Sequence, residues 1–271
     1  MSQIEHDEVE ASRAPLLEHL VELRQRLMVI IGFLTVGFIA CFIVSNTIYE
    51  WLLLPYRDAA AAVRGVPVDE LELTANFFAP LEFFFVRLKL ALVGAFIIVF
   101  PVISWQVYGF VAPGLYNNER GAFAPFMILS PLLFALGVSF VYFVVLPMVM
   151  RFSLGQEQMG TDSGLSIELL LNVSDYMNLI TTLMLVFGIS FQMPILMMLL
   201  AKAGLVRSST MLKGWRFAVV GIALFAAFAT PPDPVSQILL GGALLALYFL
   251  SIGAMTLMEG RRQDEDEESD S

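Results

Sequence analysis

Six long stretches without a charged residue are the feature that most limits how this chain can fold. They cover residues 27–44, 90–118, 122–150, 176–201, 217–232 and 234–258. A helix needs about 20 apolar residues to cross the hydrocarbon layer of a membrane, within a range of about 17–25. Five stretches reach that length, and 58% of the chain is hydrophobic, which exceeds the roughly half found in soluble domains. The sequence therefore predicts an all-α, polytopic membrane protein with six transmembrane helices.

The fifth stretch is short for a span. It has 16 residues, which at 1.5 Å rise per residue cover about 24 Å of a hydrocarbon layer roughly 30 Å thick. Two interpretations are open, because this stretch is either half of a re-entrant hairpin with the sixth or a short span that thins the bilayer locally. The proline-rich turn at residues 230–234 breaks the helix in both cases. The sixth stretch is long enough to cross, so we favour two spans and a tight turn.

Basic residues indicate the orientation. If the N-terminus faces the cytoplasm, that side collects ten of the 15: Arg13, Arg24, Arg26, Arg120, Lys202, Arg207, Lys213, Arg216, Arg261 and Arg262. Lys and Arg are enriched in cytoplasmic loops, so both termini are predicted to be cytoplasmic. The acidic ends, residues 1–14 and 261–271, are expected to be disordered around a six-helix domain at residues 15–260.

Few residues could support covalent or metal chemistry. Both histidines, His6 and His19, precede the first apolar stretch, and Cys41 is the single cysteine. The chain also lacks an HExxH zinc motif, so we expect no catalytic residue, metal site or cofactor. It has no basic patch for nucleic acid. An enzyme is therefore the least favoured class. A secondary transporter of a small solute stays as the alternative, although charge-free spans without an internal repeat count against it.

Two carboxylates lie near the predicted cytoplasmic membrane boundary. Glu22 belongs to the segment HLVELRQRL (19–27), whose leucines recur at helical spacing and predict an amphipathic helix lying on the membrane before the first span. Glu119 lies in the short connection between the second and third spans. Two carboxylates at one boundary can bind two guanidinium groups through charge-assisted, bidentate hydrogen bonds. The alternative is a solvated helical face with an ion pair between Glu22 and Arg26.

Polar and proline residues also interrupt the later spans. Gln192 lies in the middle of the fourth stretch, and an amide at that depth needs hydrogen-bond partners, either within the chain or on a partner helix. The segment TPPDPVSQ (230–237) predicts a polar cap on the outer side. Prolines within the second, third and fourth stretches predict kinked helices that together form a curved wall.

Five segments together resemble the TatC family, the large polytopic subunit of the twin-arginine protein translocase. They are HLVELRQRL (19–27), FVAPGLYNNER (110–120), SFVYFVVLP (139–147), FGISFQMP (187–194) and TPPDPVSQ (230–237). The resemblance runs through most of residues 15–260. It implies a concave, glove-like protein of the bacterial inner membrane that recognises twin-arginine signal peptides on folded cargo. It also implies export driven by the proton motive force, with single-span TatB and TatA partners in a complex that contains several copies of the chain.

The resemblance assigns roles to individual residues. Signal-peptide binding falls to the first two motifs, at Glu22, Arg24, Arg26, Phe110, Glu119 and Arg120. Partner helices would dock at Thr230, Asp233, Gln237 and Gln192. Pro55 and Pro101 match structural positions of the family. One residue departs from the pattern, since the family often has glutamate where this chain has Gln192. A neutral amide carries no titrating proton, so a hydrogen-bonding role is expected there.

Overall fold

The computed structural model describes residues 3–71, 76–115, 124–157, 169–202, 204–230 and 233–269. Ten α-helices lie in these ranges: α1 (Gln3–Ile43), α2 (Ser45–Arg64), α3 (Glu82–Leu115), α4 (Ala124–Phe140), α5 (Leu146–Leu154), α6 (Val173–Ser190), α7 (Met193–Lys202), α8 (Ser208–Lys213), α9 (Trp215–Ala229) and α10 (Pro234–Ser269). Within the same ranges, the only β-type pairing is an isolated bridge between Asn76 and Asn172. The predicted all-α class is confirmed.

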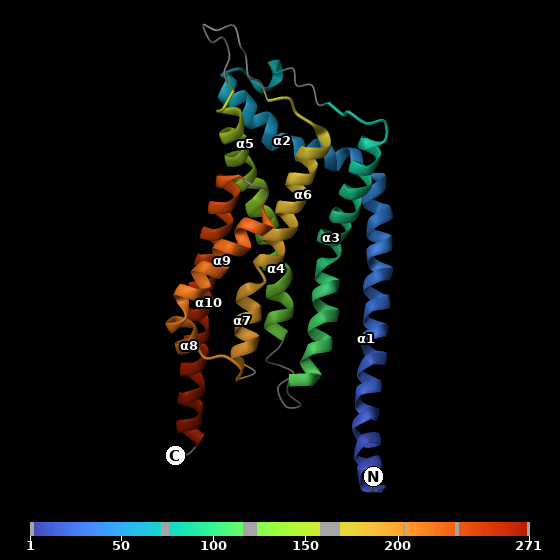
Figure 1. The fold of residues 1–271 in the computed structure, drawn as a ribbon, viewed down its shortest axis with the longest axis vertical. Helices are drawn as coiled ribbons and strands as arrows, with labels where there is room; N and C mark the ends of the chain where they lie inside the picture. The colour runs from blue at the N-terminus through green and yellow to red at the C-terminus, as the bar shows by residue number, and fades with distance from the viewer. Residues whose placement is uncertain are drawn as a thin grey trace.

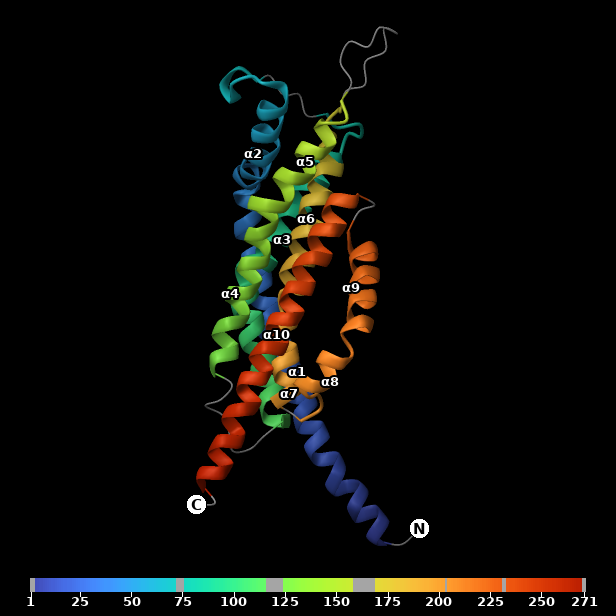
Figure 2. The ribbon, with the colours of Figure 1, turned by 90° about the vertical axis from the view of Figure 1, so that its left-hand side faces the viewer.

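The six predicted spans are present. Five apolar stretches are long enough to cross a membrane: His19–Ile43, Glu82–Phe110, Phe126–Leu154, Val173–Lys202 and Pro234–Met258. The sixth span is α9, a shorter apolar helix of 15 residues that packs beside α10. The last turn of α9 and the first turn of α10 stop short of the ends of α5 and α6, and both chain termini lie at the opposite end of the molecule (Figures 1 and 2). The spans have the expected concave, glove-like arrangement.

Helix α1 joins the predicted amphipathic segment to the first span. The sequence predicts an amphipathic helix that lies on the membrane and leads into the first span, and α1 is one continuous helix from Gln3 to Ile43. Neither Gly nor Pro interrupts residues 16–31, so the amphipathic segment continues into the span without a break. The disorder of the acidic ends and the domain limits at residues 15 and 260 stay predictions.

Small residues bring α1 and α3 together over a long seam. A Cβ atom at Gly37 would lie 3.0 Å from the side chain of Val99, and one at Gly94 would lie 3.2 Å from the Sγ atom of Cys41. Ala91 and Ala95 of α3 are fully buried against the same part of α1. Only 6% of the first span's apolar window is buried, so this narrow seam is the main contact that α1 makes with the other spans.

The connection after the first span differs from expectation. The mixed polar composition of residues 50–81, with Pro55 and Pro67, predicts a loop. Ser45–Arg64 instead forms helix α2, which lies across one end of the bundle (Figure 1). Leu52, Tyr56 and Ala59 recur at helical spacing and are buried. Burial raises the pKa of the Tyr56 phenol above its ordinary value, so the group stays neutral. The charged residues on the outer face of α2 hide this amphipathic pattern from a search for uncharged stretches.

Two tyrosine hydroxyl groups of the third and fourth spans donate hydrogen bonds to backbone carbonyls of α2. Pro55 lies inside α2 and has no N–H, so the carbonyl of Trp51, four residues earlier, lacks its helical donor. The Tyr142 hydroxyl donates to that carbonyl at 2.8 Å. One residue later, the Tyr176 hydroxyl donates to the carbonyl of Leu52 at 2.9 Å. Pro55 therefore leaves the carbonyl oxygen of Trp51 free to accept a hydrogen bond, and Tyr142 of the third span donates it.

Breaks in the third and fourth spans follow the predicted kinks. A π-helical turn, Val141–Val145, separates α4 from α5 just before Pro147, and a turn at residues 191–192 separates α6 from α7 just before Pro194. Two glycines let α4 and α6 approach closely. A Cβ atom at Gly137 would lie 2.8 Å from the carbonyl oxygen of Phe187, and one at Gly188 would lie 2.6 Å from the ring of Phe134. Because α4 and α6 cross closely here, the turn at residues 191–192, which follows α6, lies against α4.

Candidate functional site

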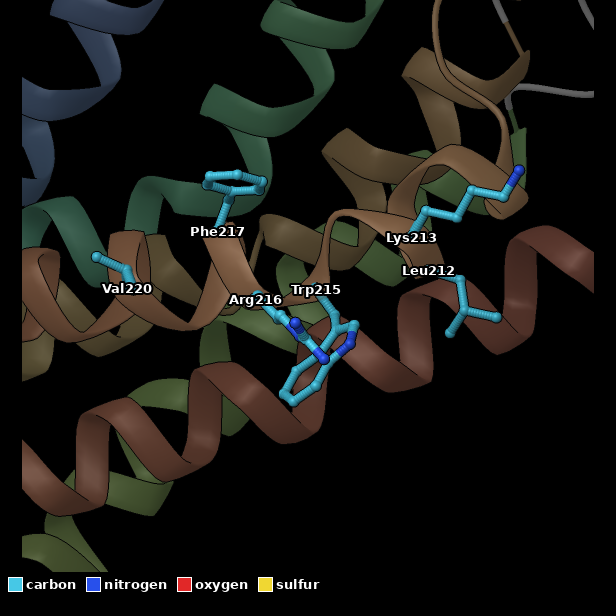
Figure 3. Close-up of a pocket in the computed structure, with 6 residues that line it drawn as sticks. All are labelled: Leu212, Lys213, Trp215, Arg216, Phe217 and Val220. Carbon is cyan, nitrogen blue, oxygen red and sulfur yellow. The ribbon is translucent and has the colours of Figure 1, made fainter.

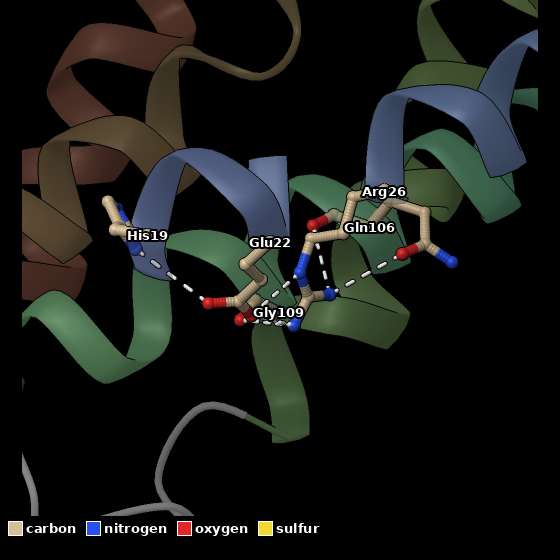
Figure 4. A network of polar contacts seen from close by, with 5 residues as sticks. All are labelled: His19, Glu22, Arg26, Gln106 and Gly109. Atoms are coloured by element: carbon tan, nitrogen blue, oxygen red, sulfur yellow. Dashed lines mark hydrogen bonds and ion pairs between the residues drawn. The ribbon is translucent and has the colours of Figure 1, made fainter. Parts of the chain in front are cut away.

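Glu22 and Arg26 lie one turn apart on α1 and face α3 (Figure 4). The Glu22 Oε1 atom accepts hydrogen bonds from Arg26 Nε at 2.9 Å and from Arg26 Nη2 at 2.6 Å. The second carboxylate oxygen, Oε2, lies 3.7 Å from His19 Nδ1. The Glu22 side chain is 35% exposed. Its carboxylate is thus held by Arg26 through one oxygen, while the other oxygen lies next to the His19 ring.

Arg26 joins this carboxylate to α3. Its Nη2 atom donates to the carbonyl of Gly109 at 3.0 Å, and its Nη1 atom lies 3.4 Å from both the carbonyl and the side-chain oxygen of Gln106. A Cβ atom at residue 109 would overlap Arg26 Nη1, so the glycine makes room for the guanidinium group. Neither Gln106 nor Gly109 is among the site residues predicted from the sequence, because only the packing of α1 on α3 brings them to Glu22.

An aromatic stack closes the other side of the site. The rings of His19 and Phe110 lie 4.1 Å apart with an interplanar angle of 14°. Phe110 is a predicted site residue, and the structure brings it next to Glu22 through His19. Arg24 is exposed on α1. Glu119 and Arg120, the other two predicted residues, lie outside the described residues. The site therefore contains Glu22, Arg26 and Phe110 of the predicted set, together with His19, Gln106 and Gly109.

Gln192 has its hydrogen-bond partners within the chain. Ser130 Oγ of α4 donates to Gln192 Oε1 at 2.7 Å, and Gln192 Nε2 donates to the carbonyl of Ser130 at 3.1 Å. Ser104 Oγ of α3 lies 3.1 Å from Ser130 Oγ. All three side chains are buried. The interhelical hydrogen bond that the sequence left as an alternative is therefore present. It uses the same Gln192 amide that was predicted to contact a partner helix.

The polar cap between α9 and α10 is partly occupied by local contacts. Thr230 Oγ1 is buried and donates to the carbonyl of Ala226 at 2.8 Å. Asp233 precedes α10 and accepts from the backbone N–H of Ser236 at 2.7 Å and from its hydroxyl group. Gln237 is exposed on the first turn of α10, so it is the predicted docking residue that is open to a partner. Pro101 lies on an exposed surface of α3.

Among the residues that the structure describes, no group of three or more His, Cys, Asp or Glu side chains is placed to hold a metal ion. The polar groups of the site are instead a paired carboxylate, a guanidinium and amide oxygens, which bind ligands through hydrogen bonds and charge.

The chain is similar to known proteins over most of its length. A model of the family described as Sec-independent protein translocase protein (TatC) matches residues 18–242. The TatC protein of Magnetococcus marinus is 34% identical over 254 residues, which cover 94% of this chain and 88% of that protein. The TatC protein of Synechocystis sp. is 36% identical over 253 residues, which cover 93% and 91% of the two chains. A crystal structure of the twin-arginine translocase receptor TatC is 34% identical with a TM-score of 0.72, and the match covers 88% of this chain and 99% of that one.

Six helical spans, one of them short, and the match to translocase proteins define a polytopic membrane component of a transport system rather than an enzyme. The chain belongs to the TatC family of Sec-independent protein translocase proteins. It is therefore a translocase component, and the alternative of a small-solute transporter is set aside.

Proposed function

We propose that this protein recognises signal peptides with paired arginines and, together with partner subunits, exports folded proteins. The observation that carries the proposal is the geometry of Glu22. Its carboxylate is fixed by Arg26 through Oε1, and its side chain is still 35% exposed at the α1–α3 seam. A fixed, accessible carboxylate next to a membrane boundary suits a guanidinium ligand, because such pairs form short, charge-assisted hydrogen bonds.

Glu119 is the proposed second carboxylate. Glu119 belongs to the connection that follows α3. Helix α3 ends at Leu115 and also carries Gln106 and Gly109. Arg26 already offsets the charge of Glu22, while a twin-arginine ligand brings two positive charges. A second carboxylate would supply an acceptor and a negative charge for the second guanidinium group. We include Arg24 and Arg120 in the same site, as the sequence motifs imply.

The two oxygens of Glu22 have different proposed tasks. Oε1 already accepts two hydrogen bonds from Arg26, so a ligand guanidinium would bind at Oε2. Arginine suits this position better than lysine, because its planar group can donate to two acceptors in fixed directions. The stacked rings of His19 and Phe110 provide an apolar flank, where charged pairs are screened less than in open water.

Partner binding and energy supply complete the proposal. We place the docking edge for TatB and TatA helices at the α9–α10 turn, with exposed Gln237 as its first contact. The short α9 would thin the membrane beside this edge. The proton motive force would drive transport. The excess of basic residues on the side of the chain termini supports cytoplasmic termini in a bacterial inner membrane.

The test measures the affinity of the purified protein for a twin-arginine peptide and for its twin-lysine version. Loss of Glu22 or Glu119 should remove a charged hydrogen bond, which is worth roughly 1.5–3 kcal/mol or about ten- to a hundredfold in affinity. The variants are Glu22→Ala, Glu119→Ala and Glu119→Lys. The charge reversal should cost more than the alanine change, because it places a positive group before a positive ligand.

Glu50→Ala is the matched control, since Glu50 is an exposed acid on α2 at the opposite end of the first span. It should leave both affinities unchanged. If Glu22→Ala and Glu119→Ala bind the twin-arginine peptide as the unaltered protein does, while remaining folded in the membrane, the proposed site is wrong. If the unaltered protein binds both peptides equally, the arginine specificity is wrong.

A further inference from the structure

The segment that joins the fourth and fifth spans has basic residues and no acids. Between Asp175 and Asp233 the chain contains Lys202, Arg207, Lys213 and Arg216 but neither Asp nor Glu. Among the described residues, Lys213 and Arg216 take part in no ion pair. Helix α9, which begins between them, also has no acid in its first turn and no side-chain cap. Positive charge at this corner is therefore not balanced by acids of the same segment.

A hollow surface surrounds the corner between α8 and α9. It encloses about 630 Å³ and is lined by Leu212, Lys213, Trp215, Arg216, Phe217 and Val220. Figure 3 shows Trp215 and Arg216 side by side, with Lys213 extending from the preceding turn. The guanidinium carbon of Arg216 lies 5.8 Å from the centre of the Trp215 ring. Cationic and aromatic groups thus share one side of this corner.

Large apolar side chains of the same surface face outward. Phe217 is 84% exposed and Val220 is 58% exposed. They are three residues apart on α9, so they lie on one face of the helix. Because α9 is a membrane span, this face is turned toward lipid rather than toward water. The basic residues at the start of α9 and the apolar residues Phe217 and Val220 therefore follow each other along the helix, and Trp215 lies in its first turn.

We propose that this corner is a binding site for an anionic phospholipid. The phosphate of the headgroup binds Arg216, whose planar guanidinium can donate two hydrogen bonds to it. Lys213 adds positive charge from the preceding turn. An acyl chain lies along Phe217 and Val220. A free phosphate ion would use the basic groups alone and would leave the outward apolar face without a role.

The experiment titrates the full-length protein in detergent micelles with dioleoyl phosphatidylglycerol and counts bound lipids by native mass spectrometry. A basic residue near an anionic lipid contributes about fivefold in affinity. We expect Arg216→Gln and Lys213→Gln each to weaken phosphatidylglycerol binding by about that factor, and the double variant by about 25-fold. Arg216→Lys should retain most of the affinity, because it keeps the charge.

Three controls test whether binding depends on this corner, on the charge of the lipid and on the acyl chain. Arg57→Gln removes a positive charge from α2, at the other end of the molecule, and should leave lipid binding unchanged. Dioleoyl phosphatidylcholine should bind the unaltered protein and the double variant alike. Inorganic phosphate at millimolar concentration should not displace the phosphatidylglycerol. The proposal is overturned if the double variant binds phosphatidylglycerol as the unaltered protein does, if phosphatidylcholine binding falls equally, or if phosphate alone competes fully.

Discussion

The guanidinium group of Arg26 fills the space in which a side chain at Gly109 would stand. Gly109 Cα has no Cβ, and its carbonyl accepts a hydrogen bond from Arg26 Nη2 at 3.0 Å. The same guanidinium holds Glu22 through two hydrogen bonds to Oε1. A residue of α3 that touches no ligand in the proposed site therefore determines where the Glu22 carboxylate lies.

Gly109→Ala should weaken twin-arginine peptide binding without unfolding the protein. The added methyl group would meet the end of the flexible Arg26 side chain. That side chain can move away, so the helix backbones need not shift. The displaced Arg26 would release Glu22, and each lost hydrogen bond is worth about 0.5–1.5 kcal/mol. We expect an affinity loss of about two- to tenfold, measured by peptide titration.

A double-mutant cycle tests this mechanism. In an Arg26→Ala background, Gly109→Ala should have no further effect on peptide affinity, because the clashing group is absent. Gly32→Ala on α1 is the control, since a Cβ atom there would have no neighbour within 4 Å. Equal effects of Gly109→Ala with and without Arg26 would contradict the mechanism.

Gln192→Leu should lower the stability of the helix bundle by a modest amount. It removes both hydrogen bonds to Ser130, and interhelical bonds of this kind in membranes are worth around 0.6–1.7 kcal/mol. Gln192→Glu should be tolerated, because a protonated carboxyl group can both donate and accept. Unfolding of the purified protein in a denaturing detergent measures the difference. Unchanged stability of Gln192→Leu would show that the buried amide contributes nothing.

Tyr142→Phe should destabilise the attachment of α2 by leaving the carbonyl of Trp51 without a donor. The expected loss is about 0.5–1.5 kcal/mol in the free energy of unfolding. Pro55→Ala supplies a backbone N–H to the same carbonyl, so it should reduce the effect of Tyr142→Phe when the two changes are combined. Strictly additive effects would mean that Tyr142 and Pro55 do not act on the same oxygen.

Glu157→Ala should lower the free energy of unfolding more than either Gln192→Leu or Tyr142→Phe. Glu157 Oε1 lies 3.1 Å from Arg64 Nη2 and accepts the backbone N–H of Leu169 at 3.1 Å, and the Glu157 side chain is only 6% exposed. Breaking a buried pair costs roughly 3–5 kcal/mol, and the partial exposure of Arg64 places the expected value at the lower end. Replacing both residues by apolar ones, Arg64→Met with Glu157→Leu, should cost less than Glu157→Ala alone.

The sequence predicts the spans well because membranes impose length and charge limits that can be counted residue by residue. Of the predicted kinks, those near Pro147 and Pro194 coincide with observed breaks, whereas α3 continues as one helix past Pro101. Helix α2 is missed because its buried residues alternate with Arg57, Asp58 and Arg64, which a search for uncharged stretches rejects. Its amphipathic spacing, with Leu52, Tyr56 and Ala59 on one face, is the signal that could have found it.

The candidate site is only partly readable from the sequence. Glu22 and Arg26 are four residues apart, so their ion pair follows from helical spacing alone. Gly109 and Gln106 are more than 80 residues away from Glu22 along the chain, and nothing local connects them to it. Gln192 poses a different difficulty, because the sequence shows that its amide needs a partner but cannot choose between Ser130 and a separate protein.

The small-residue seam between α1 and α3 has a consequence for the distant carboxylate. The proposed peptide site is built from these two helices, so its geometry depends on how far one has slid along the other. A slip of one residue is about 1.5 Å, which is enough to break the hydrogen bond from Arg26 to Gly109. Gly37 and Gly94 let the two helices approach closely along this seam, because a Cβ atom at either position would meet Val99 or Cys41. A larger side chain at either glycine would therefore move Glu22 relative to its supports at the membrane surface, and peptide affinity would report on packing in the membrane interior.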